Sequence, residues 1–216
     1  MQNRGYIINH KTIQRLMKEL GLHCAVRLKK YRSYKGQIGK IAPNIISRNF
    51  NAVKPNKKWV TDITEFSLCG QKLYLSPILD LYNDEIISYS ISLHPHFSQV
   101  TDMLNRAFEK ISDTAGLILH SDQGWQYQMK TYQELLAEKG VHQSMSRKGN
   151  CLDNAVMENF FGLLKTELFY LQKFDSIEQF MQELHNYIDY YNNRRIKMKL
   201  KGMSPVNYRT HSLKSA

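Results

Sequence analysis

The first apolar strand of the chain reads Trp59-Val60-Thr61-Asp62-Ile63-Thr64-Glu65-Phe66, with a carboxylate in its middle. A carboxylate inside a buried strand costs free energy unless it is paired or binds a metal ion. The alternative is that Asp62 lies on the solvent face of an edge strand. The role of Asp62 therefore depends on which other charged groups the fold brings to it.

Two further acids stand in similarly distinctive surroundings. Asp122 follows a short apolar strand in Leu119-His120-Ser121-Asp122-Gln123-Gly124, and Glu158 lies on an amphipathic helix in Asp153-Asn154-Ala155-Val156-Met157-Glu158. Ligand sites in α/β sheets lie beyond the C-terminal ends of strands, although Asp before Gly also forms turns and a helical Glu is usually solvated. Three convergent carboxylates are the minimum of a two-metal phosphoryl-transfer site. We therefore take Asp62, Asp122 and Glu158 as candidate catalytic residues and metal ligands.

Other polar residues surround Glu158 along the chain. Asn154 and Lys165 lie one turn before it and two turns after it, on the same helix face. Lys165 would hold a phosphate near the metal ions as a point charge, or else is an ordinary surface lysine. The loop before the helix carries Arg147 and Lys148, and basic loops at helix N-termini attract phosphate. The alternative for this loop is a plain helix entry.

The remaining periodicities predict strands and helices in a fixed order. Strands are expected at 59–68, 72–81, 85–93, 116–120 and 141–144, and helices at 98–111, 129–139, 153–168 and 177–192. The first three strands, joined by short turns, predict an antiparallel meander. The order βββαβαβα is that of an RNase H-like α/β domain, a five-stranded mixed sheet flanked by helices.

Charge divides the chain into a basic start, an acidic middle and a basic end. Residues 1–58 carry a net charge of +13, residues 59–193 a net charge of −9 and residues 194–216 a net charge of +7. Basic arms are the electrostatic footprint of a polyanionic partner. The alternative is that these charges lie on solvated faces and a disordered tail.

Charge and periodicity together predict four parts. Residues 1–26 form a small basic helical segment, with a helix near 8–22 that Gly21 ends, and 27–58 form a basic linker or arm. Residues 59–193 form the RNase H-like core, and 194–216 form a basic C-terminal tail. No apolar run approaches the roughly 20 residues of a membrane span. Three cysteines without a CxxC pair argue against a disulfide framework and suit a reducing cytoplasm.

Four ordered blocks of sequence resemble one family. They are Trp59–Glu65, His120–Tyr127, Ser144–Phe161 with Lys165 beyond it, and Tyr191–Arg195 with Ser204-Pro205. These blocks resemble the DDE transposases of bacterial insertion sequences, in particular the IS-three family with its retroviral-integrase-like catalytic core. Asp122 and Glu158 are separated by 35 residues, as in that family's acid motif.

The resemblance implies a DNA transposase that cleaves strands and transfers them by metal-dependent attack at phosphorus. It implies two Mg²⁺ ions held by Asp62, Asp122 and Glu158, with Mn²⁺ as a substitute, and Lys165 as the family's basic residue. The expected partners are insertion-sequence ends, target DNA and further copies of the chain, with no membrane. Arg147, Lys148, Asn154, Lys165, Arg194 and Arg195 are the residues expected to contact DNA. The expected location is the bacterial cytoplasm at the nucleoid.

Two other functions stay open. Members of the family carry a longer N-terminal region with a helix-turn-helix unit, and the helix near 8–22 resembles the end of that unit. The chain would then be a truncated, catalytically silent DNA-binding remnant that regulates full-length transposase. An RNase H-like nuclease acting on RNA–DNA hybrids would share the fold and the metal ions, but would cut without joining.

Overall fold

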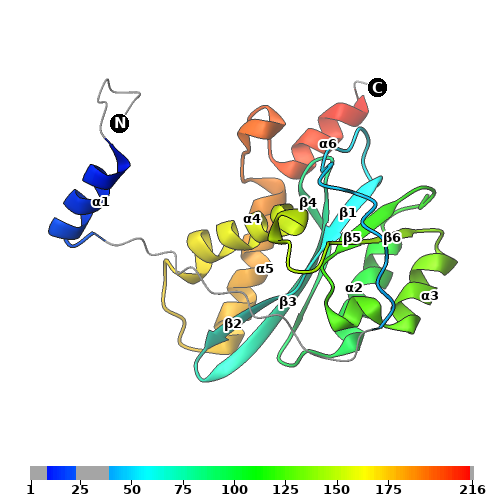
Figure 1. Cartoon of the computed structure of the whole chain (residues 1–216), viewed down its shortest axis with the longest axis horizontal. Coiled ribbons are helices and arrows are strands. Elements are labelled where there is room, and N and C mark those ends of the chain that lie inside the picture. The colour runs from blue at the N-terminus through cyan, green and yellow to red at the C-terminus, as the bar shows by residue number, and fades with distance from the viewer. Residues whose placement is uncertain (1–8, 23–38, 215–216) are drawn as a thin grey trace. The chain divides into compact units, whose positions relative to one another are not determined.

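The computed structural model of the chain describes residues 9–22 and 39–214 (Figure 1). Internal contacts divide the chain into two units, Met1–Arg32 and Ser33–Ala216. The described part of the first unit is a helix with its flanking residues, and the second unit is a sheet with helices packed on it.

Helix α1 (His10–Glu19) is closed at both ends by local hydrogen bonds. At its start, the Asn9 side chain accepts a 2.9 Å hydrogen bond from the backbone N–H of Lys11, which satisfies a donor of the first turn. At its end, Gly21 has a φ of 65°, and its N–H and that of Leu22 donate to carbonyls of the last turn. The predicted glycine stop at Gly21 is therefore confirmed.

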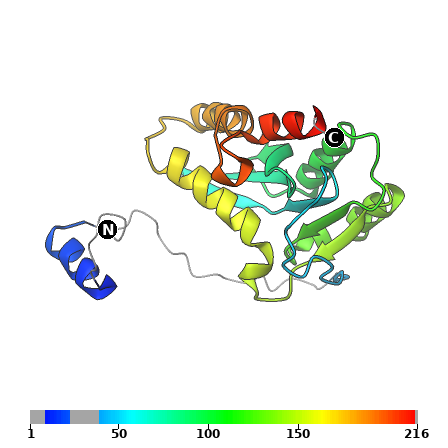
Figure 2. The same cartoon turned by 90° about the horizontal axis from the view of Figure 1, so that it is seen from above.

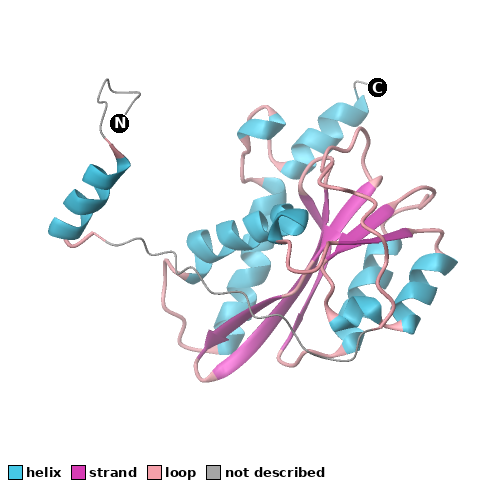
Figure 3. Ribbon diagram, in the orientation of Figure 1, coloured by secondary structure: helices cyan, strands magenta, loops and turns pink. Residues whose placement is uncertain are grey.

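One mixed sheet forms the centre of the second unit (Figure 3). Its strands are β1 (Lys58–Thr61), β2 (Thr64–Leu68), β3 (Gln71–Asp80), β4 (Glu85–Ser92), β5 (Ile118–Ser121) and β6 (His142–Met145). Strand β3 pairs antiparallel with β4 on one side and with β1 and β2 on the other, while β1, β5 and β6 are parallel neighbours. Because β1 and β2 are halves of one interrupted strand, the predicted RNase H-like sheet of five strands is confirmed.

The interruption between β1 and β2 begins at Asp62, where the sequence predicts a continuous strand. Pairing on either side of the gap keeps the same register along β3. In this register Pro77 lies opposite Asp62, and proline has no N–H to donate across the ladder. The Thr61 hydroxyl instead donates to the Pro77 carbonyl at 2.8 Å. The break therefore follows from a proline on the neighbouring strand, which a local pattern does not reveal.

Helices cover both faces of the sheet (Figures 1 and 2). They are α2 (Phe97–Phe108), α3 (Lys130–Glu138), α4 (Ala155–Leu164) and α5 (Ile177–Asn193). Val60 packs with α4 and α5 on one face, and Trp59 packs with α2 and α3 on the other. Consecutive residues of β1 thus enter two separate cores. Within the described ranges, no helix combines the length and apolar character of a membrane span.

The segment 39–57, predicted as part of a basic linker, lies against the sheet. Ile46 is buried in the core under α4 and α5, and its N–H donates to Ser144 Oγ at 3.3 Å. The Pro43 carbonyl accepts a 3.3 Å hydrogen bond from the N–H of Met145 in β6. This part of the predicted linker is corrected: it covers the edge strand β6, whose outward backbone groups need partners.

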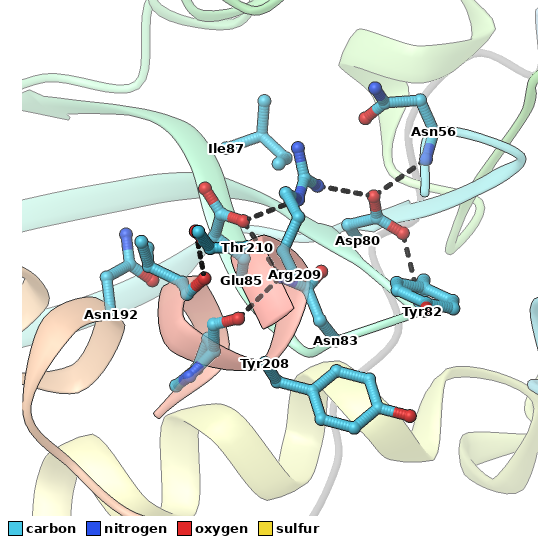
Figure 4. A network of polar contacts seen from close by, with 12 residues as sticks. Asn56, Asp80, Tyr82, Asn83, Glu85, Ile87, Asn192, Tyr208, Arg209 and Thr210 are labelled. Atoms are coloured by element: carbon cyan, nitrogen blue, oxygen red, sulfur yellow. Dashed lines mark hydrogen bonds and ion pairs between the residues drawn. The ribbon is translucent and has the colours of Figure 1, made fainter. Parts of the chain in front are cut away.

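The segment after α5, predicted as a basic tail, ends in helix α6 (Pro205–Lys214). Arg209 of this helix pairs with Asp80 of β3 at 2.7 Å and with Glu85 of β4 at 2.9 Å (Figure 4). Asp80 is fully buried, and it also accepts hydrogen bonds from the backbone N–H groups of Asn56 and Tyr82. Helix α6 is therefore tied to the sheet through a buried ion pair.

Two lysines of the same segment bind the turn between β3 and β4. Lys197 and Lys199 each pair with Asp84 at 3.0 Å. Lys197 also donates to the hydroxyl of Tyr191 at 2.6 Å, and only 11% of its side chain is exposed. The predicted tail is corrected to a folded segment whose cations neutralise acids of the sheet.

Candidate active site

Asp62 and Asp122 follow the ends of two neighbouring parallel strands. In the register of β1 and β5, Val60 lies beside His120, so Asp62 lies level with Asp122 two residues further on. Side chains two residues apart share a face of a strand. Val60 belongs to the core under α4 and α5. Both aspartates therefore lie at the same end of the sheet, on the face that α4 covers.

The two aspartates interact electrostatically. The pKa of Asp62 lies well above its usual range, first because burial disfavours the charged form and then because Asp122 carries a like charge. A 2.7 Å hydrogen bond from the Ile63 N–H opposes this rise. Burial also raises the pKa of Asp122, whose Oδ1 accepts from the Gly124 N–H at 2.8 Å. Asp122 thus forms the turn that the sequence left open as an alternative, and also interacts with Asp62.

Glu158 is an exposed side chain in the first turn of α4. Helix α4 contacts β1, and the charge of Glu158 adds to the rise in the pKa of Asp62. Partial burial raises the pKa of Glu158 itself. Among the residues that the structure describes, no three or more His, Cys, Asp or Glu side chains lie close enough together to hold a metal ion. The predicted acids therefore share one end of the sheet without forming a closed ligand set.

Lys165 lies where α4 passes into a π-helical segment, Lys165–Phe169. Its ammonium is 5.4 Å from the ring centroid of Phe66 on β2, and its charge lowers the pKa of Asp62. Single turns of π-helix occur frequently at functional sites. The positive charge of Lys165 therefore acts on Asp62, and its contact with phosphate stays a prediction.

The loop before α4 is organised by the buried carboxylate of Asp153. Arg147 donates to it from its backbone N–H at 3.0 Å and from two guanidinium nitrogens at 2.8 Å each. Arg48 donates from Nε at 2.9 Å. These bonds, those of Arg147 above all, hold the pKa of Asp153 well below its usual range. Arg147 is thus engaged by its own loop, which is the helix-entry role that the sequence left open, and its DNA contact stays a prediction.

Two further residues predicted to contact DNA follow Arg147 in the chain. Lys148 is exposed. Asn154 is buried, with an exposed fraction of 4%, and neither polar atom of its amide has a hydrogen-bond partner among the described residues. A buried polar group without a partner costs about 1–3 kcal/mol. Because this amide is closed off from solvent, the DNA contact of Asn154 stays a prediction.

Arg194 and Arg195, also predicted to contact DNA, are both in ion pairs. Arg195 donates to Glu167 from Nε at 2.8 Å and also from Nη2. The Tyr187 hydroxyl donates to the same carboxylate at 2.9 Å, and these bonds, chiefly those of Arg195, lower the pKa of Glu167. Arg194 pairs with Asp189 at an exposed position. Arg195 therefore holds the π-helical segment, and its DNA contact stays a prediction.

Sequence reasoning missed Tyr127, which is fully buried near both aspartates. Its pKa is raised well above the usual value, first by burial and then by the charges of Asp62 and Asp122. A side-chain hydrogen bond with Thr61 opposes this rise. The available signal was its place five residues after Asp122, but an apolar pattern does not distinguish such a tyrosine from core packing.

Family models match nearly the whole chain. Residues 52–151 match a model described as an integrase core domain, and residues 158–213 match a second model with the same description. Residues 1–31 match an HTH-like domain. The positions of Asp62 and Asp122 lie in the first match, and that of Glu158 begins the second.

Curated relatives share sequence over most of the chain. The putative transposase InsK for insertion sequence element IS150 of Escherichia coli is 54% identical over 212 residues, which cover 98% of this chain and 75% of that protein. An uncharacterized transposase-like protein of Haemophilus influenzae is 56% identical over 206 residues, 95% of each chain. The transposase InsF for IS3A of Escherichia coli is 32% identical over 215 residues, 99% of this chain and 75% of the relative.

Solved structures with the same architecture come from retroviral proteins. The HTLV-2 integrase catalytic core domain in complex with magnesium, in its trimeric form, matches with a TM-score of 0.54 and 15% identity over 74% of this chain and 99% of that one. A chain of the simian T-cell lymphotropic virus intasome with a PP2A regulatory subunit matches with a TM-score of 0.57 and 17% identity, over 77% of this chain and 56% of that one. At these identities the likeness concerns the fold alone.

Proposed function

The chain belongs to the insertion-sequence transposases that carry an integrase core domain, and we propose from this membership that its acid site cleaves and joins DNA strands. The reaction class is polynucleotidyl transfer. The observation that carries the proposal is the placement of Asp62 and Asp122 level with each other at the ends of β1 and β5, with the charge of Glu158 acting on Asp62.

Divalent metal ions are proposed as the cofactor. Asp62, Asp122 and Glu158 would hold two Mg²⁺ ions, with Mn²⁺ as a substitute, because carboxylate oxygens are the ligands that hard cations prefer. The like charges that raise the pKa of Asp62 are the repulsion that a bound cation would offset. When bound, such ions lower the pKa of the attacking oxygen and neutralise charge on the departing oxygen. The magnesium complex of the HTLV-2 catalytic core supports this cofactor.

The chain's own residues would position the reacting strands. In cleavage, a water oxygen bonds to phosphorus while the bond from phosphorus to the departing 3′ oxygen breaks. In joining, the freed 3′-OH attacks a target phosphate and expels a 3′ oxygen of the target. Lys165, whose charge already acts on Asp62, would hold a phosphate oxygen. Positioning and charge neutralisation then supply the rate enhancement.

DNA is the proposed partner, as insertion-sequence ends and as target. The match of residues 1–31 to an HTH-like domain supports DNA binding by the first unit, and the exposed Lys148 supports contact near α4. Action on two ends suggests a homo-oligomer assembled on DNA, and the intasome and trimeric core named above support assembly of this kind. The bacterial nucleoid is the proposed place of action, because its DNA is the substrate.

A cleavage and joining assay tests the proposal. Purified chain is incubated with a labelled insertion-sequence end and Mg²⁺, with binding followed by gel shift. Asp122→Asn should lose cleavage and joining by at least about 10³-fold while binding DNA as the wild type does. The control is Asp113→Asn, which alters an exposed acid that lies before β5.

Three results contradict the proposal. Undiminished strand transfer by Asp122→Asn would remove the acid from the site. Binding without cutting by the wild type, in both Mg²⁺ and Mn²⁺, would favour a catalytically silent DNA-binding protein. Cutting of RNA–DNA hybrids without joining of DNA would favour the nuclease.

A further inference from the structure

His120 is a fully buried side chain with both ring nitrogens in hydrogen bonds. Its Nδ1 is 2.8 Å from Ser144 Oγ on β6, and its Nε2 is 2.8 Å from the backbone carbonyl oxygen of Asp153. A carbonyl oxygen only accepts, so Nε2 carries the proton and donates it. Burial lowers the pKa of His120, in agreement with a neutral ring.

The directions of the other hydrogen bonds around the His120 ring follow from this tautomer. A neutral ring with its proton on Nε2 accepts at Nδ1, so the Ser144 hydroxyl donates to it. Ser144 Oγ in turn accepts from the backbone N–H of Ile45 at 2.9 Å. Both ring nitrogens of His120 and the Ser144 hydroxyl thus have partners. The imidazole is held in a single orientation.

His120 connects the two elements that carry Asp122 and Glu158. On β5 it lies two residues before Asp122 and on the same face of the sheet. Asp153 lies five residues before Glu158, in the turn that leads directly into α4. Hydrogen bonds from Arg147 and Arg48 fix the carboxylate of Asp153, so the backbone carbonyl of Asp153 is held in place as well.

We propose that His120 is a positioning residue of the acid site, which sets the separation of Asp122 and Glu158 by donating from Nε2 to the Asp153 carbonyl. The inference rests on the proposed function, because it assigns a purpose to the spacing of two proposed metal ligands. Partners that orient metal ligands typically change metal affinity 10–100-fold when they are removed. The Nε2 bond is therefore expected to set the metal concentration at which the site fills.

Two substitutions separate the two bonds of the ring. His120→Asn keeps an amide near the position of Nδ1 and loses the donor to Asp153. His120→Gln places an amide nitrogen near the position of Nε2 and keeps that donor. The matched control is His142→Asn, which changes an exposed histidine on the adjacent strand β6. Ser144→Ala removes the other partner of the ring and leaves the bond to Asp153.

Two readouts are measured on the full chain. One is the rise in Tm on addition of Mn²⁺ or Ca²⁺, which reports metal binding without catalysis. The other is the Mg²⁺ concentration that gives half-maximal strand cleavage. For His120→Asn, both metal midpoints are expected to rise about tenfold or more. For His120→Gln, Ser144→Ala and His142→Asn, they should stay within about threefold of the wild type.

The possible results separate failure of the His120 proposal from failure of the proposed function on which it rests. If the Tm of the wild type does not change on addition of metal ions and the wild type does not cleave DNA, the proposed function is wrong. A wild type that responds to metal ions, with His120→Asn responding at the same concentrations, would overturn the inference alone. If His120→Asn does not fold, the metal midpoints of His120→Gln and Ser144→Ala test the proposal. A tenfold rise of the metal midpoint in His120→Gln or Ser144→Ala would show that the Asp153 bond is not the determinant.

Discussion

The two ends of the sheet carry similar acids in opposite circumstances. At the site end, Asp62 and Asp122 lie level with each other, and burial first, then the like charges of Asp122 and Glu158, raise the pKa of Asp62. At the paired end, defined by Asp80, Asp84 and Glu85, each acid is in an ion pair with a cation of the C-terminal segment.

The chain places its own positive charge mainly at the paired end. Lys197, Lys199 and Arg209 come from the predicted basic tail, yet they neutralise the paired end. At the site end, the acids repel one another, and the charge of Lys165, which lies over Phe66, lowers the pKa of Asp62 only in part. In the proposed function, cations from solution would offset this repulsion. Net charge along a sequence does not distinguish these two uses.

The largest expected effect comes from Asp62→Asn at the site end. Strand cleavage should fall at least about 10³-fold, equivalent to about 4 kcal/mol in the activation barrier. In metal-free buffer near pH 7, stability to urea should stay the same or increase, because the substitution removes a partly buried charge that its neighbours repel. Cleavage assays and urea unfolding in a chelator measure both. Normal cleavage by the variant, or unfolding at a lower urea concentration than the wild type, would contradict the contrast between the two ends of the sheet.

The next effect is expected from Arg209→Ala at the paired end. The substitution leaves the buried Asp80 without its cation, which should cost about 3–5 kcal/mol of unfolding free energy. Cleavage per folded molecule should not change. Arg194→Ala serves as the control, because its exposed ion pair should contribute less than about 1 kcal/mol. Equal losses in the two variants would show that burial does not distinguish these pairs.

A smaller and pH-dependent effect is expected from Glu167→Gln, which removes another acid held by a cation of the chain. Arg195 lowers the pKa of Glu167 in the folded state, so its stabilising effect is present above the unfolded pKa of about 4.3 and is lost as pH falls through the folded value. The variant should lose about 1.5–3 kcal/mol at pH 7. Urea unfolding from pH 7 to 3 should show the difference shrinking. A constant difference would argue against a charge effect.

The smallest effect is expected from Lys199→Ala. Its side chain is 58% exposed, and Lys197 still holds Asp84 when it is removed. Exposed ion pairs contribute about 0–1 kcal/mol, so the Tm should fall by no more than a few degrees. Thermal unfolding at low and high salt measures the change. A loss above about 2 kcal/mol would place Lys199 among the buried determinants of the paired end.

Local sequence patterns predicted most elements and the neighbourhood of two acids. Period-two and period-3.6 patterns located the strands and helices within a few residues, since each buries one apolar face. The family resemblance predicted that Asp62 and Asp122 would meet, and the parallel pairing of β1 with β5 brings them level. The charge of Lys165, which the sequence placed two turns after Glu158, acts on Asp62.

Long-range contacts explain what the sequence did not predict. The break at Asp62 depends on Pro77 in another strand, and the partner of Arg195 lies 28 residues earlier in the chain. The segment around Ile46 joins the core because β6 is an edge strand. Each depends on a pairing between segments that are distant in sequence, so no window of neighbouring residues contains it.

The interruption of the first strand also gives the sheet a mechanical property. Strands β1 and β2 hold the same register along β3, so the sheet is stiff on both sides of the gap. Between them, the Ile63 amide bonds to the Asp62 carboxylate rather than to β3. Asp62 therefore lies in a short gap between two stretches that pair with β3. The Ile63 amide should therefore exchange its hydrogen faster than the amides of the strands around it.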